Sequence, residues 1–147
     1  MKLFIATGIF HPESGGPATY LHGLLPAVQA AGHTVRLLTF GDPTPQDDAY
    51  GYPVQRIPRG PLAIRPLAYA NYWRASRQYL DWADLTYAHT PGLPLRGSHD
   101  RPRAIKIVGD VAWERSIRRG LIPPTEDIDH FQTARYNPLV EALKASR

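Results

Sequence analysis

The first thirty residues constrain the fold of this sequence more than any other stretch. An apolar run of strand type, Leu3 to Ala6, leads into a loop that ends in Gly15-Gly16-Pro17. A helical period follows and continues up to residue 32. Proline suits the first position of a helix, because its φ is already helical and its missing N–H would be unpaired there. The order of strand, glycine loop and helix predicts a βα unit with the loop at the carboxyl end of its strand.

The glycine loop allows two interpretations. Backbone can approach a ligand closely at glycine, and the amides and dipole of a helix N-terminus favour an anion. Glu13 stands beside this loop and adds a carboxylate. Alternatively, Gly15 and Gly16 serve only the geometry of a tight turn, because two glycines make a weak phosphate motif. The local sequence leaves both interpretations open.

Strands of buried type alternate with helical segments along the rest of the chain. Further strands are expected at 34–40, 54–58, 84–89 and 104–108. Further helices are expected at 67–82, 112–119, 126–135 and from 138 onwards. Segment 44–52 is expected to be a loop, Pro26 to kink or break the first helix, and Asn137 to cap the last. This alternation predicts an α/β fold with a Rossmann-like parallel sheet of about five strands flanked by helices.

Ligands on a parallel sheet bind beyond the carboxyl ends of the strands, so the residues there are candidates for a site. His89 ends the fourth expected strand, and Asp110 follows the fifth, with Trp113 and Glu114 close behind. Either carboxylate can accept hydrogen bonds from sugar hydroxyls or act as a base, and Trp113 can stack on a sugar. Each residue also has a structural alternative. Asp110 can cap a helix, and Glu114 can interact favourably with the positive end of the dipole of that helix. His89 and Trp113 can be packing residues.

Composition excludes several classes of protein. The 147 residues suffice for one domain with a real core. The chain has no Cys, which excludes disulfides, thiolate chemistry and Cys-based metal sites. No apolar run is long enough to span a bilayer and no signal peptide is visible, which favours a cytoplasmic protein. The net charge of +4 is spread over dispersed arginines without a nucleic-acid-binding motif, so no nucleic-acid partner is expected.

The helix expected at 67–82 raises the question of a membrane surface. It carries Trp73 beside Arg74 and Arg77, and aromatic and basic helices can lie on anionic lipid. Core packing is the preferred interpretation, because aromatic side chains at helical spacing are expected to cover a sheet. The residues expected on that covering face are Tyr69, Tyr72, Trp73, Ser76 and Leu80.

The opening KLFIATGIFHPESGGPATYLHGLLPAVQAAGHTVRLLTFGD resembles the N-terminal domain of family 4 glycosyltransferases, which have the GT-B fold. The shared features are the apolar strand, the P-x-x-GG loop from Pro12 to Gly16, the amphipathic helix and the Gly32-His33-x-Val35 entry into the second strand. The later segment KIVGDVAWERSIRRGLIPPTEDIDHFQTARYNPLVEAL is similar to one subgroup of that family. The resemblance covers nearly the whole chain.

The resemblance implies transfer of a sugar from a nucleotide-sugar donor to an acceptor, with retention of configuration and without an essential metal or bound cofactor. Residues 1–147 would form the acceptor-side domain, and Gly15 and Gly16 would meet the donor phosphates or the acceptor. Asp110 lies close to where many members carry an acceptor-site histidine, which is absent here. The family's C-terminal donor-binding domain, with its E-x7-E motif, has no counterpart in this sequence, and no catalytic residue is identified.

The end of the sequence leads to a further expectation. The chain stops at Arg147 inside an amphipathic pattern, which suggests a fragment or a truncated product. Leu139, Val140 and Leu143 are expected on a face left uncovered, so self-association or capture of missing elements from a partner is expected. The alternative function is therefore a truncated, non-catalytic remnant that binds a sugar or a partner.

A third interpretation is an enzyme that binds a nucleotide cofactor on a Rossmann sheet. Gly8, Gly15 and Gly16 do not form the G-x-G-x-x-G motif that such enzymes carry. No acidic residue ends the second strand at Phe40, and Asp42 comes two residues later. These departures disfavour a nucleotide-cofactor enzyme.

Overall fold

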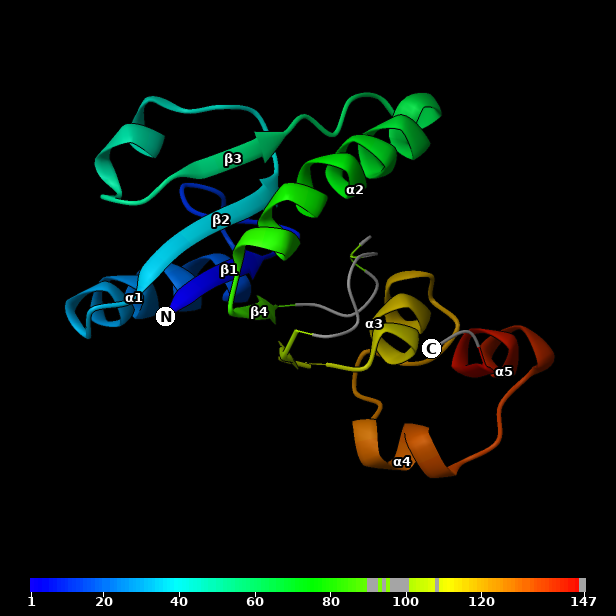
Figure 1. The fold of residues 1–147 in the computed structure, drawn as a ribbon. Coiled ribbons are helices and arrows are strands. Elements are labelled where there is room, and N and C mark those ends of the chain that lie inside the picture. The colour runs from blue at the N-terminus through cyan, green and yellow to red at the C-terminus, as the bar shows by residue number, and fades with distance from the viewer. Residues whose placement is uncertain (90–92, 94, 96–100, 108, 146–147) are drawn as a thin grey trace. The chain divides into compact units, whose positions relative to one another are not determined.

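A five-stranded parallel sheet forms the centre of the first of two compact units (Figure 1). We describe the protein from a computed structural model, which covers residues 1–89, 93, 95, 101–107 and 109–145. The first unit is Met1–Lys106 and the second is Ile107–Arg147. Each unit is described by itself.

The sheet confirms the predicted α/β, Rossmann-like architecture. Its strands are β1 Lys2–Ala6, β2 Thr34–Phe40, β3 Val54–Ile57, β4 Leu85–Ala88 and β5 Arg103–Ile105. They lie in the order β3-β2-β1-β4-β5, and every neighbouring pair is parallel. The last three strands end earlier than predicted. Val108, the predicted end of the fifth strand, lies outside the described residues.

The strand order reverses between β1 and β4. The chain lays down β1, β2 and β3 outward on one side, then crosses back to place β4 on the other side of β1 (Figure 1). In sheets of this kind, ligands bind beyond the carboxyl ends of the strands near the point of reversal. The loops that follow β1 and β4 are therefore the first candidates for a ligand-binding site.

Two long helices cover the two faces of the sheet (Figure 1). They are α1 Gly16–Ala30 and α2 Arg65–Trp82. Side chains alternate between the faces along a strand, so Leu3 of β1 packs with Leu21 of α1. Its neighbour Phe4 packs on the other face with Tyr72 of α2. No helix in the described part of the chain combines the length and apolar character needed to cross a bilayer.

Of the predicted kink or break at Pro26, the break is wrong, because α1 continues through this residue to Ala30. Pro26 lies on the exposed side of the helix, where the carbonyl that loses its N–H partner can reach water. The predicted loop 44–52 is also wrong in part, since it contains the short 3-10 helix η1 Pro45–Ala49. The carboxylate of Asp47 starts this helix by accepting hydrogen bonds from N and Oγ1 of Thr44 at 3.0 and 3.1 Å.

The prediction for the covering face of α2 is correct for three residues and wrong for two. The buried residues of α2 are Ala68, Tyr72, Ser76, Tyr79 and Leu80. Tyr69 and Trp73 are 49% and 38% exposed, although the sequence predicted them on this face. Each follows a buried residue by one position, which turns the side chain by about 100° around the helix. They therefore lie beside the buried stripe.

The second unit is a small helical cluster with its own core. Its helices are α3 Val111–Arg118, α4 Ile128–Thr133 and α5 Pro138–Ala145. Asn137 caps α5 as predicted, because its Oδ1 accepts a hydrogen bond from N of Val140 at 3.0 Å. The core consists of Ala112, Ile122, Phe131 and Val140.

The predicted uncovered face of the last helix is wrong for two of its three residues. Val140 is fully buried, and Leu143 packs against the same core. Leu139 is 53% exposed. The sequence prediction failed because the covering residues come from α3 and α4, which precede the helix.

Candidate functional site

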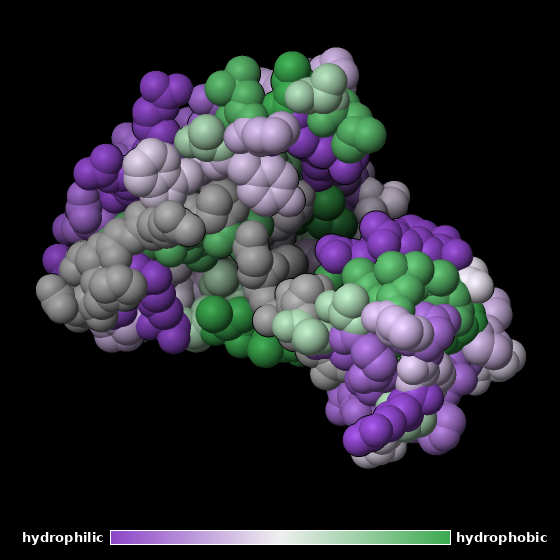
Figure 2. All heavy atoms as spheres, turned by 90° about the vertical axis from the view of Figure 1, so that its right-hand side faces the viewer, coloured by the Kyte–Doolittle hydropathy of each residue, from purple (hydrophilic) through white to green (hydrophobic). Residues whose placement is uncertain are grey.

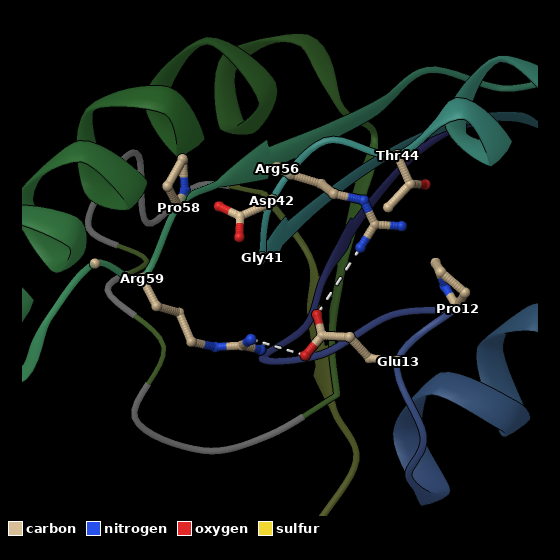
Figure 3. A pocket seen from close by; sticks show the side chains of 9 residues that line it. Pro12, Glu13, Gly41, Asp42, Thr44, Arg56, Pro58 and Arg59 are labelled. Atoms are coloured by element: carbon tan, nitrogen blue, oxygen red, sulfur yellow. Dashed lines mark hydrogen bonds and ion pairs between the residues drawn. The ribbon is translucent and has the colours of Figure 1, made fainter.

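A pocket of about 580 Å³ lies at the carboxyl ends of β1, β2 and β3 (Figure 3). Three loops build its walls, each following one of these strands. The side chains that matter for its chemistry are Glu13, Asp42, Arg56 and Arg59, with Gly41 between the second strand and Asp42. The fold therefore gathers two carboxylates and two guanidinium groups from segments that are far apart in sequence.

Arg56 at the end of β3 is the buried centre of this cluster. Its side chain is 1% exposed, and its Nε lies 2.9 Å from each carboxylate oxygen of Asp47. Its Nη2 donates to Asp47 Oδ1 at 2.8 Å and also to the backbone carbonyl of His11. A buried guanidinium needs such partners, because an unpaired buried charge is very costly. Arg56 thus joins η1 to the loop that follows β1.

Asp47 is ionised as the partner of this arginine. Burial opposes its ionisation, but hydrogen bonds from Arg56 and from the backbone of Thr44 outweigh burial and hold the pKa of Asp47 below its ordinary value of 3.8. The pair is a charge-assisted contact with several parallel hydrogen bonds, which fixes both side chains in direction.

Glu13 lies between the two arginines (Figure 3). Its Oε2 accepts a hydrogen bond from Nη1 of Arg59 at 2.7 Å, and Arg59 also donates to the carbonyl of Gly8 at 2.9 Å. Its Oε1 is buried, 3.9 Å from Nη1 of Arg56, and accepts no hydrogen bond from a described residue. Gly41 leaves room for this oxygen, since a Cβ at its φ of 135° would lie 2.7 Å from it. Glu13 Oε1 is therefore an acceptor beside the pocket.

The two glycines that open α1 differ in what they require. Gly15 has φ 154° and ψ 156°, a region that only glycine adopts easily, and a Cβ there would collide with the side chain of Ile9. A Cβ on Gly16 would meet nothing within 4 Å. Turn geometry therefore explains Gly15 but does not explain Gly16. No side chain in the described part of the chain caps the N-terminus of α1.

His89 lies at the end of β4, beside the reversal of strand order. Its backbone N donates to the carbonyl of Ala6 at 2.8 Å, and its ring is 5.3 Å from that of Tyr20 in α1. The Nζ of Lys106 lies over the Tyr20 ring, 3.2 Å from the ring centre. Burial lowers the pKa of His89, and the charge of Lys106 lowers it further. His89 and the glycine loop thus follow the neighbouring strands β4 and β1, a strand order that the sequence did not predict.

Asp110, Trp113 and Glu114 belong to the second unit, where the first two have structural contacts. Asp110 caps α3, because its Oδ1 accepts from N of Ala112 at 2.9 Å and from N of Trp113 at 3.2 Å. Trp113 packs on the core of this unit and donates from Nε1 to the carbonyl of Glu126 at 3.0 Å. Glu114 lies exposed in the first turn of α3. These contacts match the structural alternatives that the sequence left open.

Sequence reasoning missed Arg56 and Arg59. Both stand in the segment RIPRG, which ends β3 at the same edge as the other loops. The rule that selected the loops after the first, fourth and fifth strands also applies to the loop after the third strand, so this signal was present in the sequence. The pairing of Arg56 with Asp47 had no such signal, because it depends on the position of η1. The described residues contain no group of three or more His, Cys, Asp or Glu that could hold a metal ion.

The chain matches a known protein family. A family model described as a glycosyl transferase 4-like domain matches residues 15–143. This range begins at the glycine that starts the turn into α1 and covers most of the 147 residues. Comparisons with curated proteins and with solved structures give no match. The match confirms the resemblance seen in the sequence: the chain belongs to the glycosyl transferase 4-like family.

Proposed function

We propose that this chain is the acceptor-side domain of a GT-B glycosyltransferase, which transfers a sugar from a nucleotide-sugar donor with retention of configuration. The observation that carries the proposal is the pocket beyond β1, β2 and β3, with Glu13, Asp42, Arg56 and Arg59 at its walls. The family match supports the reaction class. A donor-binding domain is part of this proposal, because the pocket and the glycine loop provide one wall of a cleft.

The charges of the pocket suit an acceptor that is neutral and rich in hydroxyl groups. Its two carboxylates and two guanidinium groups cancel in formal charge. Each sugar hydroxyl can donate one hydrogen bond and accept others. The carboxylates of Glu13 and Asp42 line the pocket and are acceptors for such hydroxyls, and the exposed part of Arg59 is a donor. A dianionic ligand would have to compete with Glu13 for the arginines.

The start of α1 suits the diphosphate of the donor. The amides of its first turn lack a side-chain cap within the described residues, and the helix dipole is positive at this end. Gly16 leaves open space where a phosphate can approach the backbone. In this proposal the domain orients the acceptor and stabilises the charge that develops on the departing diphosphate.

Binding of simple glycosides tests the pocket directly. We expect saturation-transfer NMR with a panel of methyl glycosides to detect binding to the chain, and Glu13→Leu to weaken it about tenfold by removing a charged hydrogen-bond partner. Asp81→Asn is the matched control, since Asp81 is an exposed carboxylate of α2 outside the pocket. Equal loss in both variants, or no binding of any glycoside, would contradict the proposal.

Turnover tests whether the chain needs a donor-binding domain for transfer. We expect the chain alone to bind glycosides without transferring sugar from any member of a nucleotide-sugar panel. Covalent attachment of a sugar to an acceptor by the chain alone would show that no donor-binding domain is needed. Donor titration adds a second readout: nucleotide-sugar binding that Gly16→Val weakens while glycoside binding persists supports separate donor and acceptor contacts.

A further inference from the structure

The interval between Asp48 and Asp81 contains no acidic residue. It contains five arginines: Arg56, Arg59, Arg65, Arg74 and Arg77. The first two are paired with carboxylates of the pocket. The last three are exposed and form no ion pair with a described carboxylate. The segment around the start of α2 is therefore positively charged without internal compensation.

Large apolar side chains are exposed along the same segment. We call them the η2–α2 patch, since they lie on the short 3-10 helix η2 Leu62–Ile64 and on the first half of α2. The patch consists of Leu62, Ile64, Leu67, Tyr69 and Trp73, with exposed fractions of 73%, 48%, 57%, 49% and 38%. Figure 2 shows apolar surface gathered at the upper edge of the first unit, where α2 begins. Five such side chains within twelve residues are an unusual exposure for a surface helix.

The arrangement of α2 places this surface away from the sheet. The buried stripe of the helix, represented by Tyr72 and Ser76, packs on the sheet. Leu67 and Arg74 lie on the arc opposite this stripe, and Trp73 lies on the flank between the stripe and that arc. Arg77 lies over the ring of Trp73, with 5.6 Å between its guanidinium carbon and the ring centre. The outward arc thus combines apolar and cationic groups and carries no anionic group before Asp81.

We propose that the η2–α2 patch binds the surface of an anionic lipid bilayer. Apolar and aromatic side chains enter the boundary between headgroups and acyl chains, while arginines beside them meet anionic headgroups. Charge complementarity selects this partner: Arg65, Arg74 and Arg77 are cations that form no ion pair with any carboxylate among the described residues. The helix lies on the surface in this mode and does not span the bilayer.

Binding in this orientation brings the pocket to the headgroups. Pro58, Arg59 and Gly60 line the pocket and lead directly into η2. The proposal does not depend on sugar transfer, because lipid binding is measured without donor or acceptor. Loss of glycoside binding and loss of lipid binding are therefore separate outcomes.

Vesicle co-sedimentation of the full chain tests the proposal. We expect binding to phosphatidylcholine vesicles only when they contain phosphatidylglycerol, and loss of that binding in high salt. Leu62→Ser and Leu67→Ser should each weaken binding about tenfold, and Arg65→Gln or Arg74→Gln about fivefold. The fluorescence of Trp73 should shift to the blue on binding, and Trp73→Phe should remove this shift.

Matched controls come from the second unit. Leu139→Ser removes a leucine outside the patch that is nearly as exposed as Leu67, and Arg118→Gln removes an exposed arginine, so neither should weaken binding. Binding that does not respond to phosphatidylglycerol, or that falls as much in the controls as in the patch variants, would overturn the proposal. A concentration-dependent dimer in light scattering that Leu62→Ser abolishes, without vesicle binding, would assign the patch to a second copy of the chain instead.

Discussion

The two sides of the sheet's carboxyl edge are built in different ways. Beyond β2 and β3, the buried Arg56 is held by Asp47, and the more exposed Arg59 is held by Glu13. Beyond β1 and β4, at the reversal of strand order, the residues are glycines, aromatic rings and the buried imidazole of His89. The first side is fixed by paired charges, whereas the second presents the glycine loop and the imidazole of His89 near the reversal point. We therefore expect the first side to hold the loops in shape and the second to respond to pH through His89.

The largest expected effect is on the paired side, at Arg56. Arg56→Met leaves the carboxylate of Asp47 without its partner and should lower the free energy of unfolding by about 3–5 kcal/mol. Because the pKa of Asp47 is lowered in the folded state, the pair stabilises the protein at neutral pH and loses this contribution as pH falls below about 3.8. Urea unfolding at neutral pH measures the loss.

A double variant separates the effect of the ion pair on stability from that of the buried site that the pair occupies. Replacing both charges, with Arg56→Met and Asp47→Leu together, should recover part of the lost stability, because two apolar groups leave no unpaired charge. A double variant that is less stable than Arg56→Met alone would mean that the carboxylate acts mainly through Thr44 in starting η1.

The next effect concerns the two glycines on the other side. Gly15→Ala forces a side chain into a backbone conformation reserved for glycine and should cost about 1–3 kcal/mol. Gly16→Ala has open space and should leave stability unchanged or raise it by up to about 1 kcal/mol. Thermal unfolding of the two variants gives the comparison. Equal losses would show that both glycines serve the turn alone.

The sequence predicted the sheet because its signals are local. Apolar runs such as Thr34 to Phe40 alternate with helical periods, and the strand-loop-helix order at Gly15 places the first turn. It predicted His89 at the edge for the same reason. It could not predict the pairing of Arg56 with Asp47, which lie nine positions apart in sequence. The contact requires the 3-10 helix η1, and the polar composition of this segment had indicated a loop.

The sequence prediction missed the exposure of the Trp73 side chain for a different physical reason. A helix of eighteen residues that carries many aromatic rings has more apolar side chains than one sheet face can cover. Helical spacing gave the right face for Tyr72 and Ser76, but it could not decide which neighbours at its margin stay exposed. The same limit applies to Leu139, whose neighbour Val140 took the buried position.

A smaller effect is expected at the second ion pair of the paired side. The side chains of Arg59 and Glu13 are 39% and 33% exposed, so solvent screens their attraction. Arg59→Gln should therefore cost only about 0.2–1 kcal/mol, well below the loss at Arg56. At about 1 M salt, where the Debye length is about 3 Å, the difference from the wild type should shrink further. A loss as large as that of Arg56→Met would make both pairs equal parts of one network.

The smallest expected effect is the loss of stability that acidification causes at the imidazole beyond β4. Burial, reinforced by Lys106, lowers the pKa of His89 below its ordinary value of 6.5. The rings of Tyr20 in α1 and Tyr87 in β4 lie against this imidazole, with centroids 5.3 and 6.1 Å away. The unfolded chain therefore takes up the proton first as pH falls through about 6.5, and stability decreases until the folded protein is protonated too.

His89→Gln turns this argument into a measurement that also tests the comparison between the two sides. The stability difference between the wild type and His89→Gln should be smaller at about pH 5.5 than at about pH 8, because only the wild type loses the contribution of a neutral buried imidazole. An NMR titration of the His89 ring gives its pKa independently of any unfolding experiment. A difference that grows on acidification would mean that the protonated ring is stabilised in the fold. The fold would then stabilise a charge at the reversal point as it does on the paired side, and the contrast between the two sides would be wrong.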